Sequence, residues 1–515
     1  MGRLTRIIAV LITVVSVFAW TGAPTAQAAG KTLVLVDSFD IGDWDPAIIY
    51  SDEVRVMLNV YETLVRYDSE TGKVLPLLAT EWTVSDDALS WQFKLREGVK
   101  FHDGTPFNAA AAKASLERTI EMGLGGAFNW DPVEEIVAAD EHTLIIKTKT
   151  PTSIDLIATA QYGSFIYSPK AGEQGTEWFS QGNAAGTGPY KVRQWNKAQQ
   201  IVLEKFDDYW GGWTGEEFDR VIVRIISEVS TQVQMLRAGE ADIILSPPPA
   251  DLLKKLAAEE GISVGAFDSW ICLPMAVNTQ KYPTDNKKFR QALAHIMDYE
   301  AVFKEIYGGY ATVPQAPVPQ SIWGAGQLDL PKFDLARASQ LLEESGIPRD
   351  DWKVTYYAYT GNEQIRQVAE LFQALAGQVG VQVDVQVGEW GVLWDKQKSQ
   401  STAANLFAVL FWPDYGTPSS WLALEYRTED PIVFNFSYYF NPAFDAALDE
   451  GMRLEATDRK TAIKLYIEAQ QMLVDDVAAL YLADLQRTFV YRSDIQGVSF
   501  NPAYETVFVY DLRRQ

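Results

Sequence analysis

Segments with the pattern of a β-strand alternate with segments with the pattern of an α-helix through most of this 515-residue chain. Between Val381 and Val387, valine occupies every second position, which places these valines on one face of a strand. Directly before them, residues 362–380 carry apolar residues at helical spacing. Interleaved strands and helices are typical of α/β folds, and a chain of this length needs two or three lobes to bury its apolar residues. We therefore expect a multi-lobed α/β protein.

The same criteria predict the other regular elements. Strands are expected at 31–39, 90–107 (with a turn at 102–104), 199–206, 220–226, 274–278, 406–411 and 478–483. Helices are expected at 54–64, 108–121, 229–245 (running into a strand), 286–297, 298–309, 334–346 and 458–474. Asn108, Asp298 and Asp334 are expected N-caps, and Gly346 is an expected C-terminal stop. The glycines and proline of 186–195 indicate a segment that crosses between lobes.

The amino terminus has the order of a secretory signal peptide. Arg3 and Arg6 precede an apolar run, and small residues at Ala26 and Ala28 follow it. We expect cleavage after Ala28 or Ala29, which makes residues 1–29 the signal peptide. The alternative is a membrane anchor, but the apolar run has fourteen residues, and a spanning helix needs about 20.

The composition limits the location and the partners of the mature chain. The only cysteine, Cys272, lies far from the cleavage site, so the chain lacks the cysteine of a lipoprotein, and we expect a buried, unpaired thiol. The formal charge of −24 becomes −26 once Arg3 and Arg6 are removed. Such acidity argues against binding nucleic acid or anionic lipid. We expect a freely soluble periplasmic protein.

Known catalytic motifs are missing from the sequence. The three histidines, His102, His142 and His295, lack metal-ligand spacing, and we expect no cofactor. His102 and Asp103 precede Gly104 and Pro106, which favours a turn over a catalytic pair. A pair of carboxylates is defined by distance in space, so a secreted hydrolase with an unrecognised site stays an alternative.

The stretch FWPDYGTPSSW, Phe411 to Trp421, places one carboxylate, Asp414, among four aromatic residues. Its two prolines and Gly416 are expected to prevent a regular helix, so we predict a shaped loop. On local grounds the carboxylate is either solvated, or a cap of the next helix, or functional.

The order of several segments resembles family five of the bacterial extracellular solute-binding proteins, which bind peptides, dipeptides or nickel for ABC importers. The segments that carry the resemblance are VYETLVRYDSETGKVLPLLATEWTVSDDALSWQFKLREGVKFHDGTPFNA (60–109), GTGPYKVRQW (186–195), DDYWGG (207–212), FRQALAHIMDYEAVFKEIYGGYA (289–311), FDLARASQLLEESG (333–346) and FWPDY (411–415) with Pro418. Together they span nearly the whole mature chain.

The resemblance implies two α/β lobes joined by crossing strands, with an extra domain inserted in the first lobe. The expected limits are 30–64, 186–277 and 490–515 for lobe I, 65–185 for the inserted domain, and 278–489 for lobe II. Ligand is expected to be enclosed when the lobes close about their hinge. The implied partners are a small peptide or peptide-like ligand and an ABC permease of the cytoplasmic membrane, and we expect the receptor to be a monomer and not an enzyme.

The resemblance also suggests a role for the aspartate of the loop. In the family's peptide binders, the matching aspartate commonly receives the ligand's α-ammonium, and here that residue is Asp414. The family pattern W-x-x-D-Y-x-x-P has two residues between Trp and Asp, whereas only Pro413 separates Trp412 from Asp414. Aligning Asp414 therefore puts Phe411 in the tryptophan position. Because some members bind oligosaccharides on aromatic platforms, an oligosaccharide or another small solute remains an alternative ligand.

Aromatic residues near the expected cleft are further candidates for ligand contact. The sequence has sixteen tryptophans, more than we expect from core packing alone. The candidate rings are Trp412 and Tyr415 in the loop, Trp44 and Tyr50 after the first strand, Trp270 before the strand 274–278, and Trp390 after the valine-rich strand. For each ring the competing interpretation is core packing. Asn278 is expected to bond hinge backbone rather than ligand.

Overall fold

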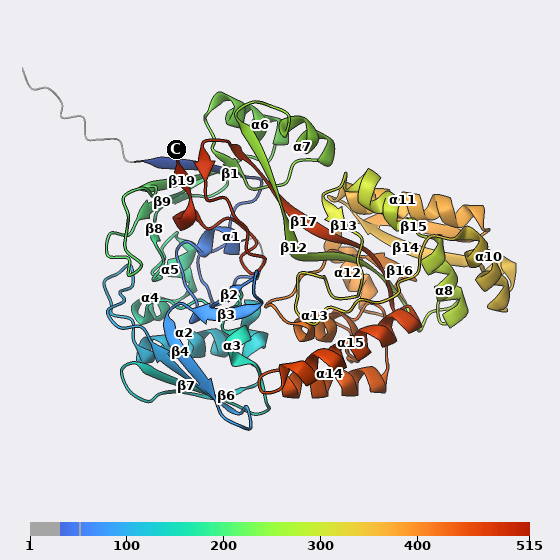
Figure 1. The fold of residues 1–515 in the computed structure, drawn as a ribbon, viewed down its shortest axis with the longest axis horizontal. Helices are drawn as coiled ribbons and strands as arrows, with labels where there is room; N and C mark the ends of the chain where they lie inside the picture. The colour runs from blue at the N-terminus through green and yellow to red at the C-terminus, as the bar shows by residue number, and fades with distance from the viewer. Residues whose placement is uncertain (1–30, 51–52) are drawn as a thin grey trace, which may run out of the picture.

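Two lobes joined by two long strands make up the computed structural model, which describes residues 31–50 and 53–515 (Figure 1). The joining strands are β12 (Ile262–Val277) and β17 (Ala479–Arg492), which lie antiparallel. The predicted signal peptide, residues 1–29, lies outside the described residues. The prediction of a two-lobed α/β protein is confirmed; the exact domain limits stay a prediction.

An eleven-stranded sheet, counted over the described residues, runs through both lobes. Its order is β15 (Gln382–Gly388), β14 (Lys353–Tyr359), β16 (Leu406–Ala408), β12, β17, β11 (Ile243–Ile244), β1 (Thr32–Asp37), β10 (Arg220–Ile225), β9 (Gln200–Lys205) and β8 (Tyr190–Asn196), with β13 (Ala311–Thr312) paired to β17. The strands β8 to β11 with β1 belong to lobe I, and β13 to β16 belong to lobe II.

The ladder between β12 and β17 changes register midway between the lobes. The pairing shifts between Asp268 and Cys272 and again at Leu273–Pro274. Ser269 Oγ fills the first gap, because it donates to the Leu485 carbonyl at 2.7 Å and accepts from the Ile271 N–H at 3.0 Å. A bulge bends a strand without ending it, so the connection can turn while its backbone groups stay hydrogen-bonded.

A small domain, residues 79–157, is attached to lobe I and has a sheet of its own. Its strands, in spatial order, are β4 (Ala79–Val84), β5 (Ser90–Leu95), β7 (Thr143–Thr148) and β6 (Val133–Ala138), followed along the chain by α3 (Ile154–Ile157). Helix α2 (Ala109–Met122) packs on this sheet through buried alanines, whose small side chains allow a close approach. Asn108 Oδ1 accepts the Ala111 N–H at 2.9 Å, which confirms this predicted N-cap.

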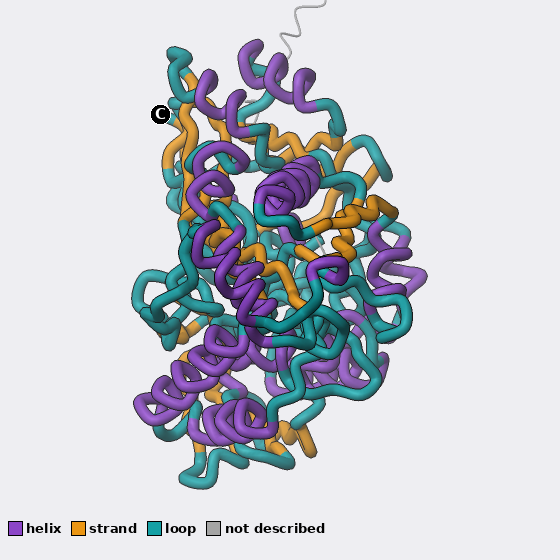
Figure 2. Tube along the Cα trace, turned by 90° about the vertical axis from the view of Figure 1, so that its right-hand side faces the viewer, coloured by secondary structure: helices purple, strands orange, loops and turns teal. Residues whose placement is uncertain are grey.

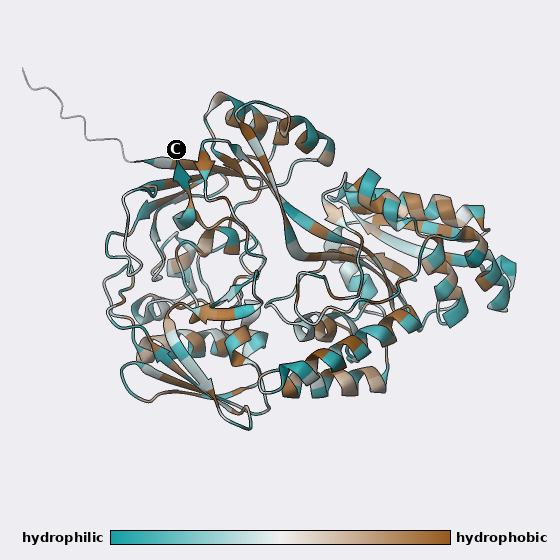
Figure 3. Ribbon diagram, viewed as in Figure 1, coloured by the Kyte–Doolittle hydropathy of each residue, from teal (hydrophilic) through white to brown (hydrophobic). Residues whose placement is uncertain are grey.

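Seen from the lobe II end, several helices lie in front of the strands (Figure 2). The helices of lobe II are α8 (Lys287–Ile296), α9 (Tyr299–Ala301), α10 (Leu335–Glu344), α11 (Glu363–Gln378), α12 (Trp390–Gln397), α13 (Pro418–Tyr426), α14 (Pro442–Leu454) and α15 (Arg459–Asp476). Those of lobe I include α1 (Val54–Met57), α4 (Pro169–Glu173), α5 (Thr176–Ser180), α6 (Val229–Ala238) and α7 (Ala250–Leu256). Both α11 and α15 mix hydrophobic and hydrophilic residues, as amphipathic surface helices do (Figure 3).

The N-cap predictions in lobe II are also confirmed. Asp298 accepts the Ala301 N–H at 3.0 Å, and Asp334 accepts the Arg337 N–H at 2.8 Å. Gly346 follows the last residues of α10 with φ +72°, a conformation that glycine adopts without strain.

The predicted helix at 54–64 is wrong beyond Met57. Residues 58–64 are buried on every side, and their carbonyl groups bond other segments. Glu62 O accepts from the Ile166 N–H, and Val60 O accepts from the Gly188 N–H. The helical spacing of apolar residues here reflects burial, and tertiary hydrogen bonds take the place of helical ones.

Two further local predictions need correction. The crossing segment 186–195 does not join the lobes; it passes residue 60 and enters β8 at the sheet edge, whereas β12 and β17 make the connection. The stretch 411–421 is a loop only as far as Thr417. Pro418 occupies the first turn of α13, where its missing N–H costs nothing, so this proline starts a helix instead of preventing one.

We predict that Gly186→Ala destabilises the protein strongly. An added Cβ would lie 2.0 Å from the backbone oxygen of Val60, and backbone cannot move aside as a side chain can. We expect the free energy of unfolding, measured by urea denaturation, to fall by about 3 kcal/mol. Gly377→Ala is the control, because it is an exposed position of α11 with open space around it, where alanine should stabilise by up to about 1 kcal/mol. Equal effects at the two positions would contradict this packing argument.

Candidate functional site

The loop 411–417 is held against the bulge of β12. Phe411 and Cys272 exchange two backbone hydrogen bonds of 2.9 Å. Farther along, a Cβ on Gly416 would lie 2.7 Å from both Trp270 and Tyr67, so only glycine fits there. The Gly416 carbonyl accepts a hydrogen bond of 2.7 Å from Trp323 Nε1. The loop therefore has one packed conformation, and it holds Asp414 in place.

Asp414 is a buried carboxyl group, 6% exposed. Its backbone N–H donates to Ser420 Oγ at 3.2 Å, and its Oδ1 accepts from the Tyr50 hydroxyl at 2.9 Å. Burial raises the pKa of Asp414 to about 6, and the neighbouring Tyr50 and Asn129 groups, which favour the ionised form, offset only part of this rise. Such a carboxylate is available for a cation that replaces its lost hydration.

The contact between Tyr50 and Asp414 joins the two lobes. Tyr50 lies in the loop that follows β1, and its ring packs on Tyr162, with ring centroids 4.9 Å apart, and on Phe128, at 5.6 Å. The pKa of the Tyr50 hydroxyl is raised, first by burial and then by the charge of Asp414. The loop after the first strand thus faces lobe II.

A cavity of about 630 Å³ adjoins Asp414, between the small domain and helices α13 and α14. The small domain contributes residues 128–132, 150–153 and 157, and lobe II contributes 414–415, 419–420, 423–424, 427, 449, 452–453 and 455. Its volume lies in the range that is usual for ligand sites in proteins.

Asp414 Oδ2, Asn129 Nδ2 and Ser153 Oγ are buried polar atoms of residues that line the cavity; the Asn129 amide lies close enough to Asp414 to favour its ionised form, whereas Ser153 Oγ has no hydrogen-bond partner among the described residues. Asn129 is 7% exposed and Ser153 is 6% exposed, so bulk water does not cover them fully. A polar ligand in the cavity would supply the partner that Ser153 Oγ lacks.

The structure brings three of the predicted site residues together. Asp414 and Tyr415 line the cavity, and Tyr50 touches Asp414 from the other lobe. Tyr415 packs against the core of the small domain as well as the core under α13 to α15. Assignment of these residues to ligand binding stays a prediction.

The other four predicted rings lie elsewhere. Trp44 is buried in the lobe I core, and Trp270 is buried beside Gly416 in the lobe II core, so in this conformation neither side chain has surface to offer a ligand. Trp270 also lies within β12, which begins earlier than the predicted strand. Trp390 is 41% exposed at the start of α12, and Trp412 is 38% exposed. Neither belongs to the cavity wall.

The sequence contains no signal for Asn129 or Ser153. Asn129 lies in the 3-10 helix Gly125–Trp130 and Ser153 lies in the connection before α3, and only the tertiary structure brings them to the cavity that Asp414 lines. Asn278 is buried, but its side chain does not bond the hinge strands as predicted: its Oδ1 accepts the Gln280 N–H at 3.1 Å, and its Nδ2 donates to Gln400 Oε1 at 3.3 Å. Cys272 is buried and unpaired, as predicted.

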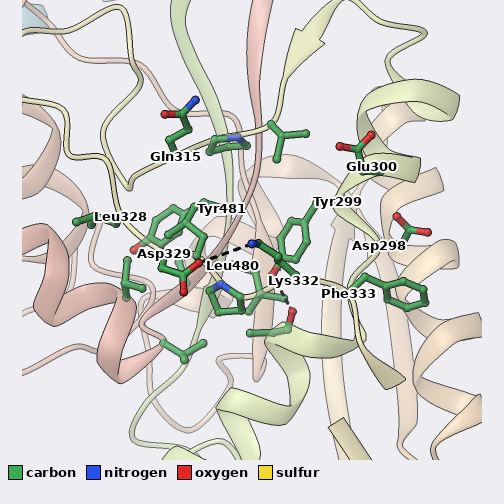
Figure 4. A pocket seen from close by; sticks show the side chains of 18 of the residues that line it. Asp298, Tyr299, Glu300, Gln315, Leu328, Asp329, Lys332, Phe333, Leu480 and Tyr481 are labelled. Atoms are coloured by element: carbon green, nitrogen blue, oxygen red, sulfur yellow. Dashed lines mark hydrogen bonds and ion pairs between the residues drawn. The ribbon is translucent and has the colours of Figure 1, made fainter. Parts of the chain in front are cut away.

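A larger cavity, about 880 Å³, lies inside lobe II (Figure 4). All of its wall comes from residues 294–333 and 474–481, and the predicted site residues are absent from it. Closure of one lobe on the other would not enclose a ligand there. We therefore take the cavity at Asp414 as the candidate functional site.

Neither a metal centre nor a membrane span is evident in the described ranges 31–50 and 53–515. They contain no cluster of three or more His, Cys, Asp or Glu side chains that could hold a metal ion. They also contain no helix with the length and apolar character needed to cross a bilayer. His102 Nε2 lies 2.9 Å from the Gly188 carbonyl oxygen, and burial lowers the pKa of this histidine to about 4, which fits a structural turn.

Comparison with known proteins identifies the family. Residues 73–430, well over half of the chain, match the family model "Bacterial extracellular solute-binding proteins, family 5 Middle". The chain belongs to this family. Members of family 5 bind solutes outside the cytoplasm, and they are solute-binding proteins rather than enzymes.

Similar proteins cover almost all of this family 5 chain. The glutathione-binding protein GsiB of Pectobacterium atrosepticum is 28% identical over 96% of this chain and 94% of that protein. The probable D,D-dipeptide-binding periplasmic protein DdpA of Escherichia coli K12 is 28% identical over 95% of each chain. The periplasmic binding protein DppA of Helicobacter pylori, solved in complex with the peptide STSA, has a TM-score of 0.77 and 26% identity, and covers 94% of this chain and 98% of that one.

We predict that burial of Asp414 makes the stability of this family 5 protein pH-dependent. The pKa of the Asp414 carboxyl is about 6 in the folded protein, whereas an unperturbed aspartate has a pKa of 3.8. The protonated carboxyl therefore stabilises the folded state fully below about pH 4, and this contribution is lost as the pH rises through 6. Asparagine does not titrate. The stability of Asp414→Asn relative to the unmodified protein, as the difference in the free energy of unfolding, should therefore increase by about 2 kcal/mol from pH 4.5 to pH 7.5. Urea denaturation of both proteins at both pH values measures this change. The same stability difference between the two proteins at pH 4.5 and at pH 7.5 would contradict the prediction.

Proposed function

We propose that this family 5 protein is the periplasmic receptor of an ABC importer for a peptide or peptide-like ligand with a free amino group. The observation that carries the proposal is Asp414, a buried carboxyl group at the meeting point of the lobes that lines a cavity. An ammonium group that reaches this carboxylate would form a charge-assisted hydrogen bond with it. Proteins similar to this chain are named for binding glutathione, a D,D-dipeptide and the peptide STSA, and each of these ligands carries an amino group.

The lobe arrangement supports a hinge mechanism for this receptor. Ligand would enter while the lobes are apart, and closure would bring the Tyr50 side of lobe I against Asp414. The bent ladder of β12 and β17 would serve as the hinge. The closed form would then present a surface to the permease that the open form does not.

Charge removal at Asp414 tests the proposed anchor. The ligand is first identified by mass spectrometry of material that co-purifies with the native protein. Because a hydrogen bond between charged groups contributes roughly 1.5–3 kcal/mol, Asp414→Asn should weaken binding about ten- to a hundredfold. Acetylation of the ligand's amino group should cost the unmodified protein a similar factor and the variant little more, since both changes remove one contact.

Calorimetry on the four combinations of protein (unmodified or Asp414→Asn) and ligand (free or acetylated amino group) shows whether Asp414 binds the ammonium group or only shapes its loop. Two independent, additive losses would show that Asp414 only shapes its loop. A natural ligand without an amine would overturn the anchoring role and favour an oligosaccharide or another solute on exposed rings such as Trp412 and Trp390. Products formed from the ligand on incubation would instead support a hydrolase.

We also predict that the mature protein closes on its ligand as a monomer. Small-angle scattering of the purified protein should show a smaller radius of gyration at saturating ligand, because hinge closure makes a two-lobed molecule more compact. The forward scattering should correspond to one chain in both states. An unchanged radius at saturation would count against hinge closure, and a doubled mass would count against the monomer.

A further inference from the structure

The cavity inside lobe II has no part in the proposed function. It measures about 880 Å³, within the range that is usual for small-molecule sites. Leu328, Leu480 and the ring of Tyr299 line its apolar part (Figure 4). The Tyr299 hydroxyl donates to the Ala294 carbonyl at 2.9 Å, so the polar end of this ring is already bonded within lobe II. The wall therefore suits the apolar part of a small molecule.

Two exposed apolar side chains belong to the same wall. Val313 is 37% exposed, and Phe333 is 41% exposed. Both lie in residues 313–333, which connect β13 to α10, contain four prolines, and form neither helix nor strand over this described stretch. We call residues 313–333 the strap. Exposed apolar surface beside a cavity is typical of a binding site, because an occupant removes that surface from water.

The charges of the wall favour a cation. Its described residues include three carboxylates, Asp298, Glu300 and Asp329, and one ammonium group, Lys332. Lys332 Nζ lies 3.8 Å from Asp329 Oδ1, and Glu300 pairs at 2.8 Å with Lys304, which is not in the wall. Carboxylates still outnumber the cation of the wall, and aromatic rings also attract cations. An apolar molecule with a positive charge fits this combination better than an anion does.

The strap also supports the loop that bears Asp414. In its middle, Trp323 Nε1 donates to the Gly416 carbonyl at 2.7 Å. Ser321 Oγ donates to the Ser269 carbonyl at 2.9 Å, at the bulge of β12. The two ends of the strap, 313–315 and 327–333, line the cavity. One segment therefore contacts the lobe II cavity, the hinge strand and the loop of the candidate site.

We propose that the lobe II cavity is a second binding site, for a small apolar organic cation, and that its occupant steadies the strap and with it the loop of Asp414. The occupant would place its apolar part against Phe333 and Leu480 and its charge near the carboxylates. Because all of the wall belongs to lobe II, binding would not require the lobes to close. Such an occupant would act on the site at Asp414 without competing for it.

The probe is 2-phenylethylammonium, which has one ring and one ammonium group, and 3-phenylpropionate is an anion of similar shape. Both are titrated by calorimetry into the mature protein, unmodified and as Asp414→Asn. We expect the cation to bind both proteins equally well, since Asp414 is not in the cavity wall, and the anion to bind about fivefold more weakly.

Three results of these titrations would overturn the inference. Loss of cation binding in Asp414→Asn would show that the probe occupies the site of the proposed function, which would then stand. Equal binding of the anion would exclude recognition of a cation. Absence of binding up to about 10 mM would exclude the site, because a specific pocket of this kind should hold a one-ring cation more tightly.

Matched variants locate the bound cation. Phe333→Ala should weaken its binding about three- to tenfold, whereas Phe440→Ala should not, because Phe440 is 44% exposed in the same lobe and is not in the cavity wall. Asp329→Asn should weaken binding about twofold. Asp395→Asn is its control, since Asp395 also pairs with a lysine three residues later but lies outside the wall. Equal effects of each variant and its control would overturn the assignment to this cavity.

Hydrogen exchange measures the effect on the loop. Saturating cation should slow amide exchange in residues 411–417 of the unmodified protein about two- to threefold. Trp323→Phe keeps a ring but removes the donor to Gly416, so it should bind the cation without this slowing. Unchanged exchange in the unmodified protein at saturation would show that the strap does not transmit binding. No peptide is present in this experiment, so its outcome is independent of the proposed function.

Discussion

The antiparallel ladder between β12 and β17 is the interaction on which the two-lobed arrangement depends. It pairs residues from Ile262 with Arg492 at one end to Ala276 with Ala479 at the other, so backbone hydrogen bonds, interrupted only at the bulge, pass from lobe I into lobe II. Its bulge at 268–272 is where the loop bearing Asp414 attaches, through the exchange of bonds between Cys272 and Phe411. The hinge and the candidate site therefore share one structural element, which would couple bending of the ladder to the position of the carboxylate.

The electrostatics of the site follow from burial. A carboxyl group removed from water resists ionisation unless other groups replace its hydration. Tyr50 supplies one hydrogen bond to Asp414 from the opposite lobe, and the Asn129 amide favours the ionised form from the small domain. A site built in this way disfavours the empty, ionised state and gains most when a cationic donor arrives. The same lack of compensation makes the site costly for folding, which is common at functional sites.

Local patterns predicted the elements and several of their ends. Alternating valines predicted β15, and Asn108, Asp298 and Asp334 cap their helices because capping depends on atoms three residues away in the chain. The failures have a common cause. Residues 58–64 are not helical because their backbone groups bond distant segments, and sequence analysis could not separate Trp44, a core residue, from exposed Trp412, because both are aromatic residues in loops.

The sequence by itself determined the α/β class, the resemblance to family 5 and the choice of Asp414, because these depend on periodicity and on the order of motifs along the chain. Tertiary structure alone decided which residues surround that carboxylate. Tyr50 reaches Asp414 across 364 residues of sequence, and Asn129 and Ser153 line the same cavity from another domain. No local pattern encodes such neighbours, because their proximity comes from how β12, β17 and the small domain pack, and packing depends on contacts throughout the chain.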